Sequence, residues 1–86
     1  MLNLRRYLYE RLRKDAIIRK IDYWKDKLRD EEYKYRNAYA EYEYAKYNYF
    51  EDCKDEIDRL KEVADEYKSN IYYAERQISN LENQLY

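Results

Sequence analysis

Few side chains in this sequence could do chemistry, and most of them are carboxylates, cations or phenols. The chain of 86 residues has no His and no Gly, and Cys53 is its single cysteine. It therefore lacks a histidine base, the ligands of a zinc site and a glycine-rich phosphate loop, and Cys53 has no orienting partner for nucleophilic catalysis. A tyrosine nucleophile needs a preorganised pocket, which a slender helical bundle rarely offers. We predict that the protein is not an enzyme and uses no cofactor.

Five carboxylates between residues 51 and 58 could attract a hard cation such as Ca²⁺. They are Glu51, Asp52, Asp55, Glu56 and Asp58. No Gly opens a binding loop, however, and the ligand spacing of a calcium hand is absent. Acidic residues are also favoured in the first turn of a helix, where the helix dipole stabilises them. We interpret the cluster as a charged helix start and predict no metal site.

Basic side chains are concentrated in the first fourteen residues. Arg5, Arg6, Arg11, Arg13 and Lys14 alternate with Tyr7 and Tyr9, so this segment could contact phosphates and stack on bases. The cations are spread around the helix, however, and an acidic middle of the chain would repel a nucleic acid. Residues 1–29 carry a net charge of +6 and residues 30–66 a net charge of −7. This asymmetry favours pairing of the basic part with the acidic part, within one chain or between chains.

The 14 tyrosines are the other chemically useful side chains. A tyrosine buries much area with few rotors and keeps a hydroxyl for a polar rim, which suits a protein interface. Several tyrosines fall outside the apolar seams described below. Those that we predict to contact a partner are Tyr33, Tyr39, Tyr44, Tyr47, Tyr72 and Tyr73.

A regular apolar pattern defines the elements that must position these side chains. Residues spaced alternately three and four apart form a seam on one side of an α-helix, and the seam must be buried against another helix. The first seam contains Ile17, Ile21, Trp24, Leu28, Glu31, Tyr35, Ala38, Tyr42, Ala45 and Tyr49, and only Glu31 interrupts it. The second contains Phe50, Cys53, Ile57, Leu60, Ala64, Tyr67, Ile71, Ala74, Ile78, Leu81 and Leu85. Cys53 is therefore expected to be a small buried residue, with a cross-chain disulfide or a reactive thiol as alternatives.

The two seams differ by one residue in register, which requires a skip or a turn near Glu51 and Asp52. A turn there makes the arms antiparallel and pairs residues whose numbers sum to 102, such as Trp24 with Ile78. A long parallel coiled coil remains an alternative, because Ile at a positions with Leu at d positions also suits two parallel strands.

Charges beside the seams favour the antiparallel arrangement. It places Lys25 near Glu75 and Glu32 near Lys68, and both pairs are attractive. Each exposed pair contributes only a few tenths of a kcal/mol, so such pairs orient the arms more than they stabilise them.

Residues 1–14 are predicted to form a short helix of their own. Leu4, Leu8 and Leu12 lie on one side, and Asp15 is a suitable N-cap for a following helix. In a continuous helix this leucine side would face away from Ile17 and Ile21. We therefore expect the chain to bend near Asp15.

The predicted fold class is all-α, an antiparallel coiled-coil helical hairpin with a short N-terminal helix. Self-association is expected to complete it to a bundle, because a two-helix hairpin buries only one stripe. A single helical domain spans 1–86, with the short basic helix at 1–14, the first arm at 16–49 and the second arm at 52–86. No apolar run approaches the roughly 20 residues of a membrane span, and no secretory signal is recognised, so we expect a cytoplasmic location.

Three functions follow from these surfaces. The first is a non-catalytic protein–protein interaction module, an assembly subunit or adaptor, whose partner is a second copy in a homodimer or higher assembly. The second is a small inhibitor of the viral or mobile-element kind that binds a host defence or nucleic-acid-processing enzyme, which the acidic 30–66 segment would suit. The third is nucleic-acid binding through the basic N-terminal helix.

Overall fold

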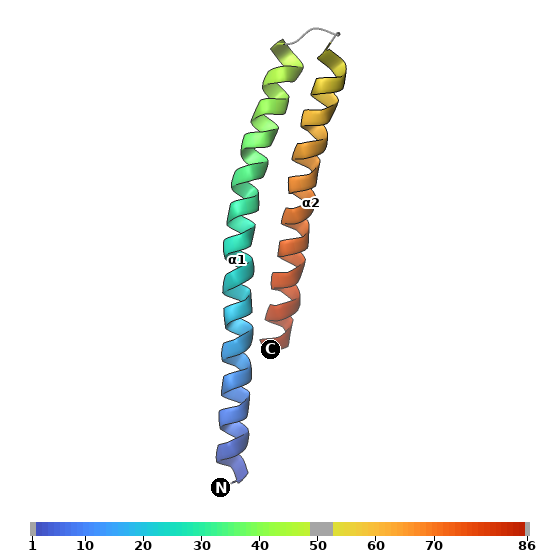
Figure 1. Cartoon of the computed structure of the whole chain (residues 1–86). Helices are drawn as coiled ribbons and strands as arrows, with labels where there is room; N and C mark the ends of the chain where they lie inside the picture. Colours follow the sequence, from blue (N-terminus) through green and yellow to red (C-terminus); the bar gives the residue numbers. More distant parts are fainter. Residues whose placement is uncertain (1, 49–52, 86) are drawn as a thin grey trace.

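The computed structural model describes residues 2–48 and 53–85 and consists of two long antiparallel helices (Figure 1). Helix α1 spans Leu2–Asn48 and helix α2 spans Lys54–Leu85. The chain extends over 75 × 14 × 14 Å with a radius of gyration of 20.5 Å. A compact domain of this length would have a radius of gyration of about 12 Å. The molecule is therefore a thin rod, and the predicted all-α antiparallel hairpin is confirmed.

The helices are long because nothing in the sequence interrupts them. The chain has neither Gly nor Pro, the two residues that most strongly disfavour a helix interior. Packing of an apolar side supplies most helical stability in proteins, and the two seams provide such a side on each arm. Residues 17–48 of α1 and all of α2 lie against one another, and we call these segments the paired region.

Burial follows the predicted seams closely. Every seam residue from Ile17 to Ala45 and from Ile57 to Leu85 is buried or half-buried. The main core cluster contains Ile17, Ile21 and Leu81, with Trp24, Ile78 and Leu85 packed against it. These contacts agree with the predicted antiparallel register, in which the numbers of paired residues add up to 102. Toward the other end of the rod the buried positions are small, at Ala38, Ala45 and Ala64. Tyr49, Phe50 and the predicted turn at Glu51 and Asp52 lie outside the described residues.

Glu31, which interrupts the first seam, is buried with a partner on the other helix. Its side chain is only 6% exposed, and the side-chain amide of Asn70 donates a hydrogen bond of 3.2 Å to its Oε2. A buried carboxylate without a partner would cost several kcal/mol, so this bond explains how the seam tolerates Glu31. Asn70 therefore fixes a polar cross-link inside an otherwise apolar seam.

The separate N-terminal helix is not found, and α1 continues through Asp15 without a break. A break would leave up to four amides and four carbonyls without helical partners, and one Asp cap satisfies only one of these amides. Because α2 ends at Leu85, opposite Ile17, residues 3–16 extend past the end of the hairpin (Figure 1). Every side chain from Asn3 to Ala16 is exposed. We call residues 3–16 the overhang.

Cys53 is exposed, so the prediction of a buried cysteine is wrong. It directly precedes α2, whose first half-buried residue is Ile57. A seam position is buried only where the opposite helix lies alongside, and Cys53 falls beyond the last buried residues of the paired region. The thiol is free, and a cross-chain disulfide stays a prediction.

The ion pairs found within residues 2–48 and 53–85 both lie inside α1. Arg29 pairs with Asp26, and Lys34 Nζ lies 3.0 Å from Asp30 Oδ2. The predicted attractions between Lys25 and Glu75 and between Glu32 and Lys68 are therefore not closed ion pairs. An exposed ion pair between two helices is only slightly more stable than the two separately hydrated charges. Residues three or four apart on one helix are already neighbours, so they can pair without further ordering of the helices.

Candidate protein-binding surfaces

The six tyrosines predicted to bind a partner are all exposed, but they do not form one continuous surface. Tyr33, Tyr39, Tyr44 and Tyr47 lie on α1, and Tyr72 and Tyr73 lie on α2. The molecule is too thin to bury large side chains outside the seam. The tyrosines are therefore available to a partner, in separate groups along the rod.

Tyr39 has neighbours for both its ring and its hydroxyl. Its ring centroid lies 5.8 Å from that of Tyr35 and 6.0 Å from that of Tyr42. A hydrogen bond to the carboxylate of Glu43, together with the negative charge of that carboxylate, raises the pKa of Tyr39 above its ordinary value. The phenol stays protonated and is not an activated nucleophile.

A second aromatic group bridges the two helices. The Trp24 ring is in edge contact with Tyr23, at 5.3 Å between centroids, and with Tyr73 of α2, at 5.5 Å. Sequence reasoning placed Trp24 in the seam and Tyr73 outside it, and it overlooked Tyr23. Tyr73 lies five residues from Ile78, the residue paired with Trp24, which is more than one helical turn along α2, so the register alone did not predict this contact.

Some tyrosine rings make cation–π contacts with lysine side chains of their own helix. Lys46 Nζ lies 5.7 Å from the Tyr47 ring centroid, and Lys68 Nζ lies 6.0 Å from that of Tyr72. Exposed contacts of this kind contribute about 0.5–1 kcal/mol. They hold the lysines close to the helix surface, so these tyrosines present a mixed apolar and cationic face.

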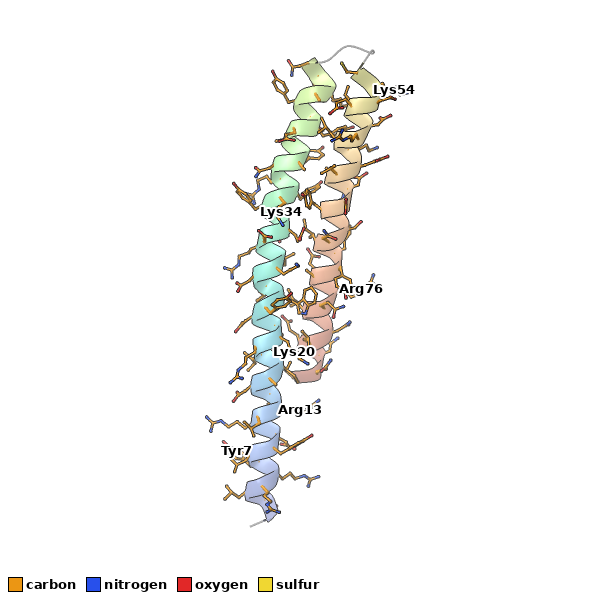
Figure 2. All side chains as sticks on the ribbon, in the orientation of Figure 1. Tyr7, Arg13, Lys20, Lys34, Lys54 and Arg76 are labelled. Carbon is orange, nitrogen blue, oxygen red and sulfur yellow. The ribbon has the colours of Figure 1, made fainter. Side chains whose placement is uncertain are left out.

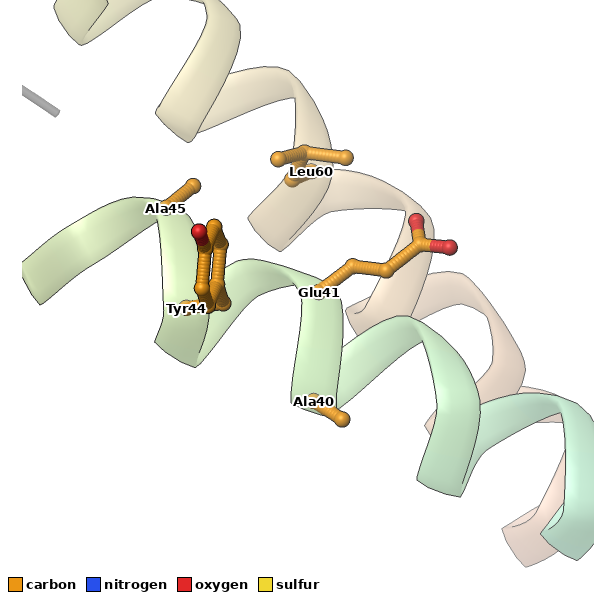
Figure 3. A pocket seen from close by; sticks show the side chains of 5 residues that line it. All are labelled: Ala40, Glu41, Tyr44, Ala45 and Leu60. Carbon is orange, nitrogen blue, oxygen red and sulfur yellow. The ribbon is translucent and has the colours of Figure 1, made fainter. Parts of the chain in front are cut away.

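An open groove lies between the helices toward the reversal of the chain (Figure 3). Its volume is about 390 Å³, and its lining residues are Ala40, Glu41, Tyr44, Ala45 and Leu60. We call it the tip groove. Its floor is apolar because it includes two seam residues, the buried Ala45 and the half-buried Leu60. The sequence analysis did not predict this groove.

The predicted phosphate-contacting residues all lie on the overhang. Arg5, Arg6, Arg11, Arg13 and Lys14 are exposed, and Figure 2 shows Arg13 and Tyr7 on a part of α1 that extends past α2. A shallow pocket lined by Tyr7, Glu10, Arg11, Lys14, Asp15 and Ile18 lies on the same part of α1. Within one chain, the described residues of the acidic segment therefore do not pair with the overhang.

Leucines make the overhang apolar on one side. Leu4, Leu8 and Leu12 are 64%, 49% and 69% exposed. Residues four apart form a continuous ridge on a helix, which is the surface that packs into a groove of another helix. This ridge has no neighbour in the described part of the chain.

Two observations concern metal binding and protonation in the described part of the chain. No group of three or more His, Cys, Asp or Glu side chains within them is arranged to hold a metal ion. The hydrogen bond and negative charge of Asp30 raise the pKa of Lys34, which keeps this amine protonated. Neither α1 nor α2 is long and apolar enough over its described residues to cross a membrane.

Comparison with models of protein families, with curated proteins and with solved structures found no match for this chain.

Proposed function

We propose that the chain is a non-catalytic interaction module that assembles with copies of itself through exposed apolar surfaces. The observation that carries this proposal is the overhang, a stretch of helix whose leucine ridge has no cover within the described chain. Packing supplies most helical stability in proteins, and an isolated helix of about 12–15 residues is marginal in water. The overhang would gain both order and burial from a partner.

The thin core of the paired region supports the same proposal. Its one cluster of large buried side chains is at the open end of the hairpin, while Ala38, Ala45 and Ala64 occupy buried positions farther along. Two helices joined by so little apolar burial are seldom stable alone. Association of two hairpins would bury tyrosines that one hairpin leaves in water.

Sedimentation velocity over a concentration series tests this proposal. We expect a monomer at low concentration and a dimer or larger species at high concentration. Replacing Leu4, Leu8 and Leu12 by Ser should shift the series toward monomer, whereas the control Asn80→Ser at an exposed polar site should not. A wild-type chain that remains monomeric at every concentration would overturn the assembly role.

Nucleic-acid binding is a second candidate, and one observation favours it. The five cations of the overhang are exposed and lie beyond the C-terminal end of α2, so they are available to phosphates. The overhang carries five Lys/Arg and two Asp/Glu, a net charge of +3. Tyr7 and Tyr9 on the same stretch are exposed and could stack on bases.

A salt titration of labelled single-stranded and duplex oligonucleotides tests this candidate. Binding at low salt that weakens steeply with added salt, and that disappears when Arg5, Arg6, Arg11 and Arg13 become Ala, would support it. Absence of any binding at low salt would remove it. The inhibitor hypothesis stays a prediction without a structural observation of its own.

A further inference from the structure

The two ends of the rod carry different apolar surfaces, an exposed ridge at one end and an open groove at the other. At one end the overhang presents Leu4, Leu8 and Leu12 as a ridge about two turns long. At the other end the tip groove is open and has an apolar floor. An amphipathic helix that lays its apolar side into a groove is a common mode of protein recognition.

The tip groove has the lining that a leucine ridge requires. Figure 3 shows the Tyr44 ring beside Ala45 on α1, with Leu60 on the neighbouring helix. The small side chain of the exposed Ala40 allows another helix to approach closely, while the half-buried Leu60 and the Tyr44 ring provide apolar contact area. Glu41 places a carboxylate at the edge of this lining, where it can meet a cation of the incoming helix.

Charge complementarity selects the overhang as the occupant. Five cations and two carboxylates give the overhang a net charge of +3. The first part of α2, from Lys54 to Glu66, carries six Asp/Glu and three Lys/Arg, a net charge of −3, and all these side chains are exposed. This acidic half of α2 contains Leu60 and lies at the groove end of the rod. Two overhangs packed on each other would instead bring like charges together.

One chain cannot make this contact by itself, because the overhang and the tip groove lie at opposite ends of a rod 75 Å long. Two copies placed side by side and antiparallel bring each overhang beside the groove of the other copy. The spacing between overhang and groove is the same in both copies, so the two joints form at once and the assembly closes with two-fold symmetry.

We propose that the overhang of one copy docks in the tip groove of a second copy, with its leucine ridge on Tyr44 and Leu60 and its cations toward the acidic half of α2. This inference rests on the proposed assembly function and names the partner and both contacting surfaces. A stable dimer buries about 800 Å² on each partner. Two identical joints help to reach this area because together they bury twice the area of one joint.

A pair of complementary variants tests the proposal by sedimentation velocity of the full-length chain. Leu8→Asp disables the overhang, and Ala40→Arg blocks the groove with a bulky cation; both positions are exposed, so neither change disturbs the seam. We expect each variant alone to weaken dimerisation by about tenfold or more. Their equimolar mixture should dimerise more strongly than either variant, because one intact overhang then meets one intact groove.

Two matched changes serve as controls for this experiment. Ser69→Arg adds the same charged side chain as Ala40→Arg at an exposed site of α2, and Asn80→Asp adds the same carboxylate as Leu8→Asp at another exposed site of α2. Both should dimerise like the wild type, and the far-ultraviolet circular dichroism of all four variants should match it. Added salt should weaken the wild-type dimer, because the joint brings opposite charges together.

The possible outcomes separate this proposal from the assembly function. If Leu8→Asp abolishes dimers while Ala40→Arg leaves them intact, the overhangs pair with each other and the groove is not their site. If neither variant affects a dimer that does form, self-association uses another surface and the docking proposal is wrong. A wild-type chain that never dimerises would overturn both proposals.

Discussion

Two stretches of one helix behave differently in this molecule. In the paired region, residues 17–48 of α1 lie against α2 and bury a seam with alternating spacings of three and four. In the overhang, residues 3–16 continue the same helix with leucines spaced four apart, and every side chain is exposed. The residues spaced alternately three and four apart are therefore buried against α2, whereas the leucines spaced four apart are not covered by the described part of the chain. The continuity of a helix therefore does not indicate which of its sides another element covers.

The largest difference between the two stretches should appear when a leucine is truncated in each. Leu81→Ala removes a buried side chain from the main core cluster, and we expect the free energy of unfolding to fall by about 2–3 kcal/mol. Leu12→Ala in the overhang should change it by less than about 0.5 kcal/mol in the monomer. Urea unfolding followed by circular dichroism at low protein concentration measures both. Equal losses would mean that the overhang is packed within a single chain.

A smaller effect is expected at the polar cross-link of the paired region. Asn70→Ala leaves the buried Glu31 carboxylate without its donor, which should cost about 1–3 kcal/mol of unfolding free energy. Glu31→Leu removes the carboxylate and completes the apolar seam, so this variant should be as stable as the wild type or more stable. Urea unfolding of both variants tests the prediction. A destabilised Glu31→Leu variant would show that the hydrogen bond contributes more than the carboxylate costs.

The smallest expected effect lies on the exposed side of the paired region, at Tyr39. Glu43 raises the pKa of this phenol above its ordinary value of 10.0. Because the folded pKa is raised, the associated stability is present below pH 10 and is lost as the pH rises through the folded pKa. Glu43→Gln should return the Tyr39 pKa toward its ordinary value. A pH titration of the assigned Tyr39 ring signals by nuclear magnetic resonance, in the wild type and in Glu43→Gln, measures this. An unchanged Tyr39 pKa in Glu43→Gln would contradict the assigned cause.

The hairpin could be predicted from the sequence because both seams are long and regular. Their one-residue register difference required a skip or a turn near residue 50, and the antiparallel pairing that a turn gives, with residue numbers that sum to 102, placed Ile21 beside Leu81. Even the interruption at Glu31 was visible. Its partner was not, because Asn70 lies outside the seam and reaches Glu31 only through a side-chain hydrogen bond between the helices.

The wrong predictions share one physical cause. The spacing of apolar residues shows which side of a helix they occupy, but it does not show whether another helix covers that side. The leucines of the overhang looked as though they needed burial within the chain, which suggested a bend at Asp15. The heptad position of Cys53 suggested burial where the paired region has already ended. The tip groove was missed for a related reason, because its depth depends on how far apart two helices hold Ala45 and Leu60.

Exposure of the six predicted binding tyrosines followed from their positions outside the seam, and the structure confirms it. Their binding role stays a prediction. The basic residues of the overhang were expected to meet the acidic segment, and within one chain they do not. In the hairpin, the acidic part of α2 from Lys54 to Glu66 lies opposite residues 36–48 of α1, whereas the overhang is at the other end of the rod.

The most direct test of this account is hydrogen exchange of the backbone amides of α1, measured by mass spectrometry at low and high protein concentration. At low concentration we expect fast exchange in residues 3–16 and slow exchange in residues 17–48, because the overhang lacks a neighbour. At high concentration, exchange in the overhang should slow markedly, while exchange in the paired region changes little. Exchange in the overhang that is the same at both concentrations would contradict the claim that this segment is the docking element of the protein.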